Sequence, residues 1–217
     1  MENIIAFLII SACSLMIFFA SDFLYIRLKV SSEYTRKLSH VLSGILACSL
    51  PIYFDSHWWV LAICTSFLVL LYLSIKFNFL RGINSVERKT YGSILYPIAI
   101  YICFVLNELL RSNPSEMRLY WTAILIMAIS YPLAALIGKN FPIYRFKTVA
   151  FGKSIGGSLA FFILAFFIAY PLLPYENKFV FAFILSFSVT LVELLSSKGF
   201  DNILVPLFCF LLFLIFQ

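Results

Sequence analysis

Charged residues are scarce in this chain, and so are the residue types that build metal centres. Asp, Glu, Lys and Arg make up 12% of the 217 residues, and histidine occurs twice. This scarcity, with 63% hydrophobic residues and a mean hydropathy of +1.00, excludes a water-soluble domain. The five cysteines fall inside apolar runs without a paired metal-ligand spacing, which favours a packing role over a zinc site.

Long apolar runs fill most of the chain. They cover residues 4–24, 38–53, 58–75, 94–110, 119–137, 155–173, 179–195 and 203–216. Runs of roughly 20 continuously apolar residues predict membrane-spanning helices, whereas barrel strands alternate. We therefore expect an all-α polytopic membrane bundle of eight helices, or seven because the second and last runs are short. The first run begins with Glu2 and is expected to stay as an anchored helix, not a cleaved signal.

Basic residues are concentrated in alternate loops. Thirteen of the 16 Lys and Arg residues lie in or beside four motif-bearing loops, at about 25–40, 76–93, 138–158 and 193–202. By the positive-inside rule these loops are cytoplasmic and both termini lie on the opposite side. We expect a single transmembrane domain over 1–217, in a bacterial inner membrane or the endoplasmic reticulum. The net charge of +6 is juxtamembrane, which favours anionic headgroups or a phosphorylated substrate over nucleic acid.

The first polar cluster, RKLSH at 36–40, leads into the second apolar run. Helical spacing puts Arg36 and His40 on one face, with Lys37 three residues before His40. Two cations and an imidazole can then meet one anionic group. Arg36 and Lys37 also fit as ordinary positive-inside residues, but an ionisable His40 entering an apolar run indicates function.

The second cluster, SVERKTYGSILYP at 85–97, stands at the mouth of the fourth run. It places Arg88 and Lys89 before Gly92, where backbone and exposed amides can approach a phosphate. The alternative is a plain helix entry, with Ser93 as the cap.

The third loop interleaves glycines with lysines and serines over 138–158. Lys139, Lys153, Ser154, Gly157 and Ser158 are its candidates for binding a nucleotide phosphate, because Gly tolerates unusual backbone angles and Lys supplies a point charge. The spacing does not fit a Walker loop. A basic loop whose glycines allow helix packing is the structural alternative.

The fourth cluster, VELLSSKGFDNILVP at 192–206, carries carboxylates at the membrane boundary. Glu193 lies within the seventh run, where a carboxylate is costly and calls for a cation or metal partner. Asp201 and Asn202 start the eighth run, and could also simply cap its helix.

Five segments in order resemble one enzyme family. RKLSH, RKTYGSILYP, AALIGKNF at 134–141, KSIGGSLAFF at 153–162 and VELLSSKGFDNILVP are similar to the CTP-dependent polyprenol and lipid kinases, over roughly residues 30–210. That family includes dolichol kinase, phytol kinase and CTP-dependent diacylglycerol kinase, and is grouped with the phosphatidate cytidylyltransferases. The resemblance implies transfer of the terminal phosphate of CTP to an isoprenoid alcohol or diacylglycerol, with Mg²⁺ or another divalent cation.

The resemblance also assigns residues. The matching positions are Arg36, Lys37, His40, Arg88, Gly92, Gly138, Lys153, Ser154, Gly157, Ser158, Glu193, Asp201 and Asn202. Phosphoryl transfer needs mainly cations, a metal and a positioned hydroxyl. We expect Lys153 and Lys139 to hold phosphates, Glu193 and Asp201 to hold the metal or its water shell, and His40 or Asp201 to orient the alcohol.

The chain departs from the family pattern at two carboxylate positions. Tyr131 stands seven residues before Gly138, where the family usually has Asp, and Gly156 replaces the acid of a KSxEGS-type stretch. Both changes count against metal binding and activity unless Glu87, Glu193 and Asp201 compensate.

Two other functions stay open. The first is cytidylyl transfer from CTP to phosphatidate, although the acidic, glycine-rich C-terminal stretch typical of that enzyme is absent. The second is a non-catalytic lipid-binding or transport protein. The polar residues crowd at one face instead of marking a pathway through the membrane midplane, which favours an interfacial enzyme.

Overall fold

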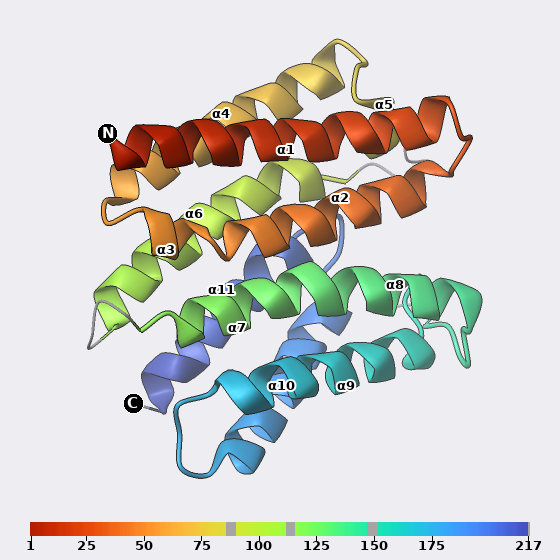
Figure 1. Cartoon of the computed structure of the whole chain (residues 1–217). Coiled ribbons are helices and arrows are strands. Elements are labelled where there is room, and N and C mark those ends of the chain that lie inside the picture. Colours follow the sequence, from red (N-terminus) through yellow and green to blue (C-terminus); the bar gives the residue numbers. More distant parts are fainter. Residues whose placement is uncertain (86–89, 112–115, 147–151, 217) are drawn as a thin grey trace.

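A computed structural model describes residues 1–85, 90–111, 116–146 and 152–216, and its regular elements within these ranges are all helices (Figure 1). The helices are α1 (Glu2–Ile26), α2 (Ser32–Ala47), α3 (Leu50–Tyr53), α4 (His57–Lys76), α5 (Arg81–Asn84), α6 (Gly92–Leu110), α7 (Arg118–Leu125), the π-helical η1 (Ile126–Ser130), α8 (Tyr131–Asn140), α9 (Ile155–Leu172), α10 (Lys178–Leu195) and α11 (Asp201–Ile215).

The predicted all-α membrane bundle is confirmed. Six described helices are long and apolar enough to cross a membrane: α1, α4, α6, the continuous α7–η1–α8 stretch, α9 and α10. The apolar α11 is shorter, and the run at 38–53 is divided between α2 and α3. How many helices cross the bilayer therefore stays a prediction.

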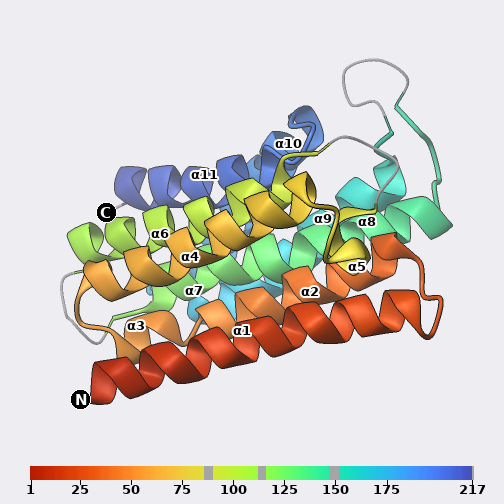
Figure 2. The ribbon, with the colours of Figure 1, turned by 90° about the horizontal axis from the view of Figure 1, so that it is seen from above.

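Successive long helices run in opposite directions, and the two chain ends lie at the same end of the bundle (Figures 1 and 2). The described parts of the connections after α1, α4, α8 and α10 lie toward the other end. This arrangement gathers the basic loops, as their alternation in the sequence predicts. Which face of the membrane they occupy stays a prediction.

The loops are shorter than the apolar pattern predicts. The helix α2 begins at Ser32, well before the apolar run, so Arg36, Lys37 and His40 all lie on a helix. Glu33 supplies an acidic residue in its first turn, which is favourable beside the helix N-terminus. The α2 cations are thereby fixed on a rigid element.

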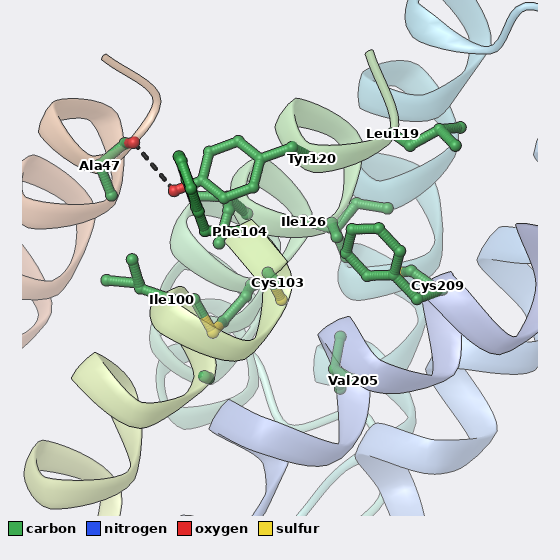
Figure 3. Close-up of a cluster of buried hydrophobic side chains, with 14 of the residues drawn as sticks. Ala47, Ile100, Cys103, Phe104, Leu119, Tyr120, Ile126, Val205 and Cys209 are labelled. Carbon is green, nitrogen blue, oxygen red and sulfur yellow. Dashed lines mark hydrogen bonds between the residues drawn. The ribbon is translucent and has the colours of Figure 1, made fainter. Parts of the chain in front are cut away.

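The core lies where α6, α7 and α11 meet (Figure 3). Phe104 and Tyr120 are fully buried with their ring centroids 6.3 Å apart, and Cys103 and Cys209 fill the space beside them. The Tyr120 hydroxyl donates a hydrogen bond of 3.0 Å to the carbonyl oxygen of Ala47, which ties α7 to α2. These contacts fix the helices that carry the polar residues.

Candidate functional site

A polar pocket opens at the end of the bundle opposite the two chain termini, between α2, α8, α9 and the facing ends of α10 and α11. Among the described residues, its charged lining comprises three cations and three carboxylates, namely Lys139, Arg145, Lys153, Glu33, Glu193 and Asp201. Segments more than 100 residues apart in the sequence are thus brought to one place.

A buried ion pair joins α9 to α10 inside this pocket. The Lys153 Nζ lies 2.7 Å from Glu193 Oε1 and also donates to the backbone oxygen of Glu193. Glu193 is only 8% exposed, so its carboxylate requires this cation. Lys153 precedes the first turn of α9, and Glu193 belongs to the last turns of α10. The partner that the sequence predicted for Glu193 is therefore Lys153.

Ser154 and the nearby glycines have structural contacts of their own. The Ser154 Oγ accepts a hydrogen bond of 3.1 Å from Gly157 N, which caps α9, and donates to the Gly138 oxygen at 3.3 Å. A Cβ at Gly138 would lie 3.1 Å from the Gly157 Cα, so these glycines let α8 and α9 pack closely. The Ser158 Oγ, in contrast, is buried with no hydrogen-bond partner among the described residues, and Ser158 lines the pocket.

Two cations of α2 are held at the edge of the pocket. Lys37 is 3% exposed, and its Nζ lies 4.0 Å from the ring centroid of Tyr131 and 4.0 Å from Glu33 Oε1. The Arg36 Nη2 lies 3.3 Å from the same carboxylate oxygen. Sequence reasoning missed Glu33 as a site residue, although its position three and four residues before the two cations was the available signal.

A π-turn in the α7–α8 helix fixes His40. Pro132 stands five residues after Met127, the spacing of a π-helical hydrogen bond, and proline has no N–H to donate to the Met127 carbonyl. His40 Nε2 lies 3.1 Å from that carbonyl oxygen. Because a carbonyl only accepts, Nε2 carries the hydrogen, and Nδ1 of the neutral imidazole is left as the acceptor. The Tyr96 ring packs 4.1 Å from the His40 ring.

The α10–α11 turn meets the start of α6 at a close backbone approach. The Asn202 Nδ2 donates to the Gly92 oxygen at 2.9 Å, and Tyr91 N donates to the Lys198 oxygen at 2.9 Å. A Cβ on Gly92 would lie 2.9 Å from Asn202 Nδ2, so Gly92 has a packing reason beside its predicted phosphate role. Asp201 and Asn202 are both buried.

Gly199→Ala is expected to destabilise the fold by about 2 kcal/mol or more. Gly199 has a φ of +90°, and a Cβ there would lie 2.3 Å from the backbone nitrogen of Gly92. Thermal unfolding of the purified protein in detergent checks this against Gly152→Ala. Gly152 has a φ of +83° but open space around its Cβ position. Equal melting temperatures for the two variants would contradict the close approach.

A second, mostly apolar cavity adjoins the polar pocket. It is formed by α1, α2, α4 and α6, and Tyr131 lines both spaces. Lys37, His40 and Asn202 lie at its polar end. The arrangement places an apolar volume, a histidine and a cation-rich pocket side by side.

The carboxylate oxygens of the pocket suit a hard divalent cation that also binds water and phosphate oxygens. Glu193 and Asp201 line the same pocket. Asn202, whose buried Oδ1 has no hydrogen-bond partner among the described residues, lines the neighbouring apolar cavity instead. Mg²⁺ is commonly bound through one or two carboxylates with water and phosphate oxygens, so Glu193 and Asp201 fit it. Within the described ranges, no group of three His, Cys, Asp or Glu residues is placed to hold a metal ion by itself.

The remaining residues predicted for the site lie outside the described ranges, at the rim of the pocket or in close helix packing. Arg88 and Lys89, together with Glu87, lie outside the described residues. Lys139 is exposed at the pocket rim, with its Nζ 5.9 Å from the Tyr34 ring centroid. A Cβ at Gly156 would lie 2.5 Å from the Phe141 oxygen, which explains why this chain has glycine there.

The sequence is 30% identical over 191 residues to a phytol kinase from Synechocystis sp., an alignment that covers 83% of this chain and 78% of that protein. No protein-family model matches the chain. No solved structure matches it either.

Proposed function

Because the chain belongs to the phytol kinase family, we propose that it transfers the terminal phosphoryl group of CTP to the hydroxyl of a membrane alcohol, either an isoprenoid alcohol or diacylglycerol. One observation carries this proposal: a cation-rich pocket and an apolar cavity adjoin at Tyr131. CTP follows from the resemblance of the five sequence segments to the CTP-dependent kinases. The active face is cytoplasmic in this proposal, in a bacterial inner membrane or the endoplasmic reticulum.

The polar pocket receives the triphosphate. Lys153 is fixed by Glu193, while Lys139 and Arg145 come from the rim and can close on phosphate oxygens. The Ser158 hydroxyl, which has no partner within the described part of the chain, can donate to the same group. Phosphoryl transfer needs little covalent work from the protein, and such cations stabilise the charge on the transferring group.

A divalent cation would be held by Asp201 and the second carboxylate oxygen of Glu193, which line the polar pocket together. Such an ion would neutralise charge that develops on the phosphate oxygens. The carboxylates that the family pattern places at Tyr131 and Gly156 are absent here, so these two residues supply the protein's donors. Glu193 is shared between this role and Lys153.

His40 receives the acceptor alcohol. Its Nε2–H is fixed on the Met127 oxygen, so Nδ1 can accept the hydrogen of a hydroxyl group at the polar end of the cavity. Rings of Tyr96 and Tyr131 pack against the imidazole at centroid distances of 4.1 and 5.7 Å. A fixed acceptor aligns the alcohol for attack without having to move.

A transfer assay with CTP labelled at the α or the γ phosphate tests the proposal. Purified protein in lipid vesicles is offered isoprenoid alcohols, diacylglycerol and phosphatidate with Mg²⁺. Label from the γ position in a lipid product is the expected result. Label from the α position would indicate cytidylyl transfer instead, and neither label in lipid would favour a non-catalytic lipid-binding or transport role.

A further inference from the structure

The apolar cavity reaches deep into the bundle from the polar end. Arg36 and Ala47 of α2 both line it, and the eleven residue steps between them correspond to about 16 Å along the helix. On α6 the lining extends from Gly92 to Ile100. The cavity is therefore long in the direction of the α2 axis.

The inner end of the cavity is closed by packed side chains. Leu50 is 2% exposed, and Ile63 and Cys64 are 5% and 6% exposed. All three belong to the main hydrophobic core, which Phe54 extends beyond them. A hydrocarbon chain that enters from the polar end is therefore stopped by the packed side chains of Leu50, Ile63 and Cys64, which we call the floor of the cavity.

We propose that this cavity holds the single hydrocarbon chain of the acceptor alcohol, and that its floor at Leu50, Ile63 and Cys64 limits the length of the chain. The inference rests on the proposed kinase function and names its acceptor: a single-chain alcohol of intermediate length. The hydroxyl lies at the polar end beside His40, and the tail points to the floor.

The shape of the cavity carries this choice of occupant. Its walls are mostly apolar, with the small hydroxyls of Ser14 and Ser43 among them. Its charged and imidazole groups, Arg36, Lys37 and His40, lie in the N-terminal half of α2. Such a distribution matches a molecule with one polar end and one apolar tail. Diacylglycerol has two tails, and its second chain would have to lie outside the cavity.

Two opposite changes at the floor test the inference. Cys64→Phe fills the inner end, and Ile63→Ala deepens it. Their matched controls are Ala62→Phe and Val69→Ala on the exposed side of the same helix. Each protein is offered an equimolar mixture of geraniol, farnesol, geranylgeraniol, solanesol and a diacylglycerol. Transfer from CTP is measured, and binding without CTP is measured separately by native mass spectrometry.

The native protein is expected to prefer farnesol or geranylgeraniol over both solanesol and diacylglycerol. Filling the floor should lower the ratio of geranylgeraniol to geraniol use about tenfold or more, and deepening it should raise the use of longer chains. The controls should keep the native profile. A misfolded variant loses all acceptors equally, so a shift in the ratio identifies the floor.

Unchanged length profiles in both floor variants would overturn the inference, as would equal binding of diacylglycerol. The two readouts keep its failure separate from failure of the kinase proposal. Length-dependent binding without transfer supports the cavity and contradicts the kinase. Transfer to alcohols of every length, unaffected by the floor variants, supports the kinase and contradicts the length limit.

Discussion

Lys153→Met is expected to reduce phosphoryl transfer about a thousandfold or more, because it removes the fixed cation of the phosphate pocket. The same change strands the buried Glu193 carboxylate, whose Oε1 lies 2.7 Å from the lysine Nζ. Loss of one member of a buried pair typically costs about 3–5 kcal/mol. The initial rate with labelled CTP and the thermal unfolding midpoint are measured together.

The double variant Lys153→Met/Glu193→Gln separates the two effects. It removes the stranded charge, so the unfolding midpoint should recover toward the native value while transfer stays lost. Lys76→Met serves as the control, because Lys76 is an exposed cation that lies outside both cavities. Recovery of transfer in the double variant would mean that neither the Lys153 cation nor the Glu193 carboxylate acts in transfer, and that the pair serves the fold alone.

Asp201→Asn is expected to lower transfer about a hundredfold to a thousandfold with little change in stability. Asparagine keeps an oxygen that can accept the 3.1 Å hydrogen bond from Asn202 N, but it lacks the negative charge that attracts a divalent cation. The rate is measured as a function of Mg²⁺ concentration. The variant should need far more Mg²⁺ for half-maximal activity.

Asp55→Asn is the matched control, since Asp55 is exposed and lies between α3 and α4, away from the polar pocket. It should leave both rate and Mg²⁺ dependence unchanged. If Asp201→Asn kept the native Mg²⁺ dependence and lost activity only through unfolding, Asp201 would be a helix cap and not a metal ligand.

The apolar pattern predicts the helical class well, because in a membrane every backbone group must be satisfied within the helix. It places the boundaries less well. The helix α2 begins at Ser32 and not near the apolar run, since Glu33 pairs with Arg36 and Lys37 at helical spacing. A hydropathy pattern assigns such a polar helical segment to a loop, because it detects only apolar residues.

The pairings within the candidate site could not be predicted from local sequence. Lys153 and Glu193 are 40 positions apart, and their pairing depends on how α9 packs against α10. Tyr131 appeared in the sequence only as a departure from the family pattern. The structure places its ring under Lys37 and between the two cavities, which no spacing rule indicates.

The π-turn at Ile126–Ser130 gives one long helix two rotational phases. Each residue turns an α-helix by about 100°, so the wider turn offsets the face of α8 from that of α7. Before the turn, Tyr120 and Ile124 face the core, and after it Ala135 and Lys139 face the polar pocket. Deleting one residue from the turn would restore a uniform α-helix. Either the α7 residues would then leave the core, or the α8 residues would turn away from the polar pocket. Pro132 favours this offset, because it has no N–H to donate to the carbonyl four or five residues before it.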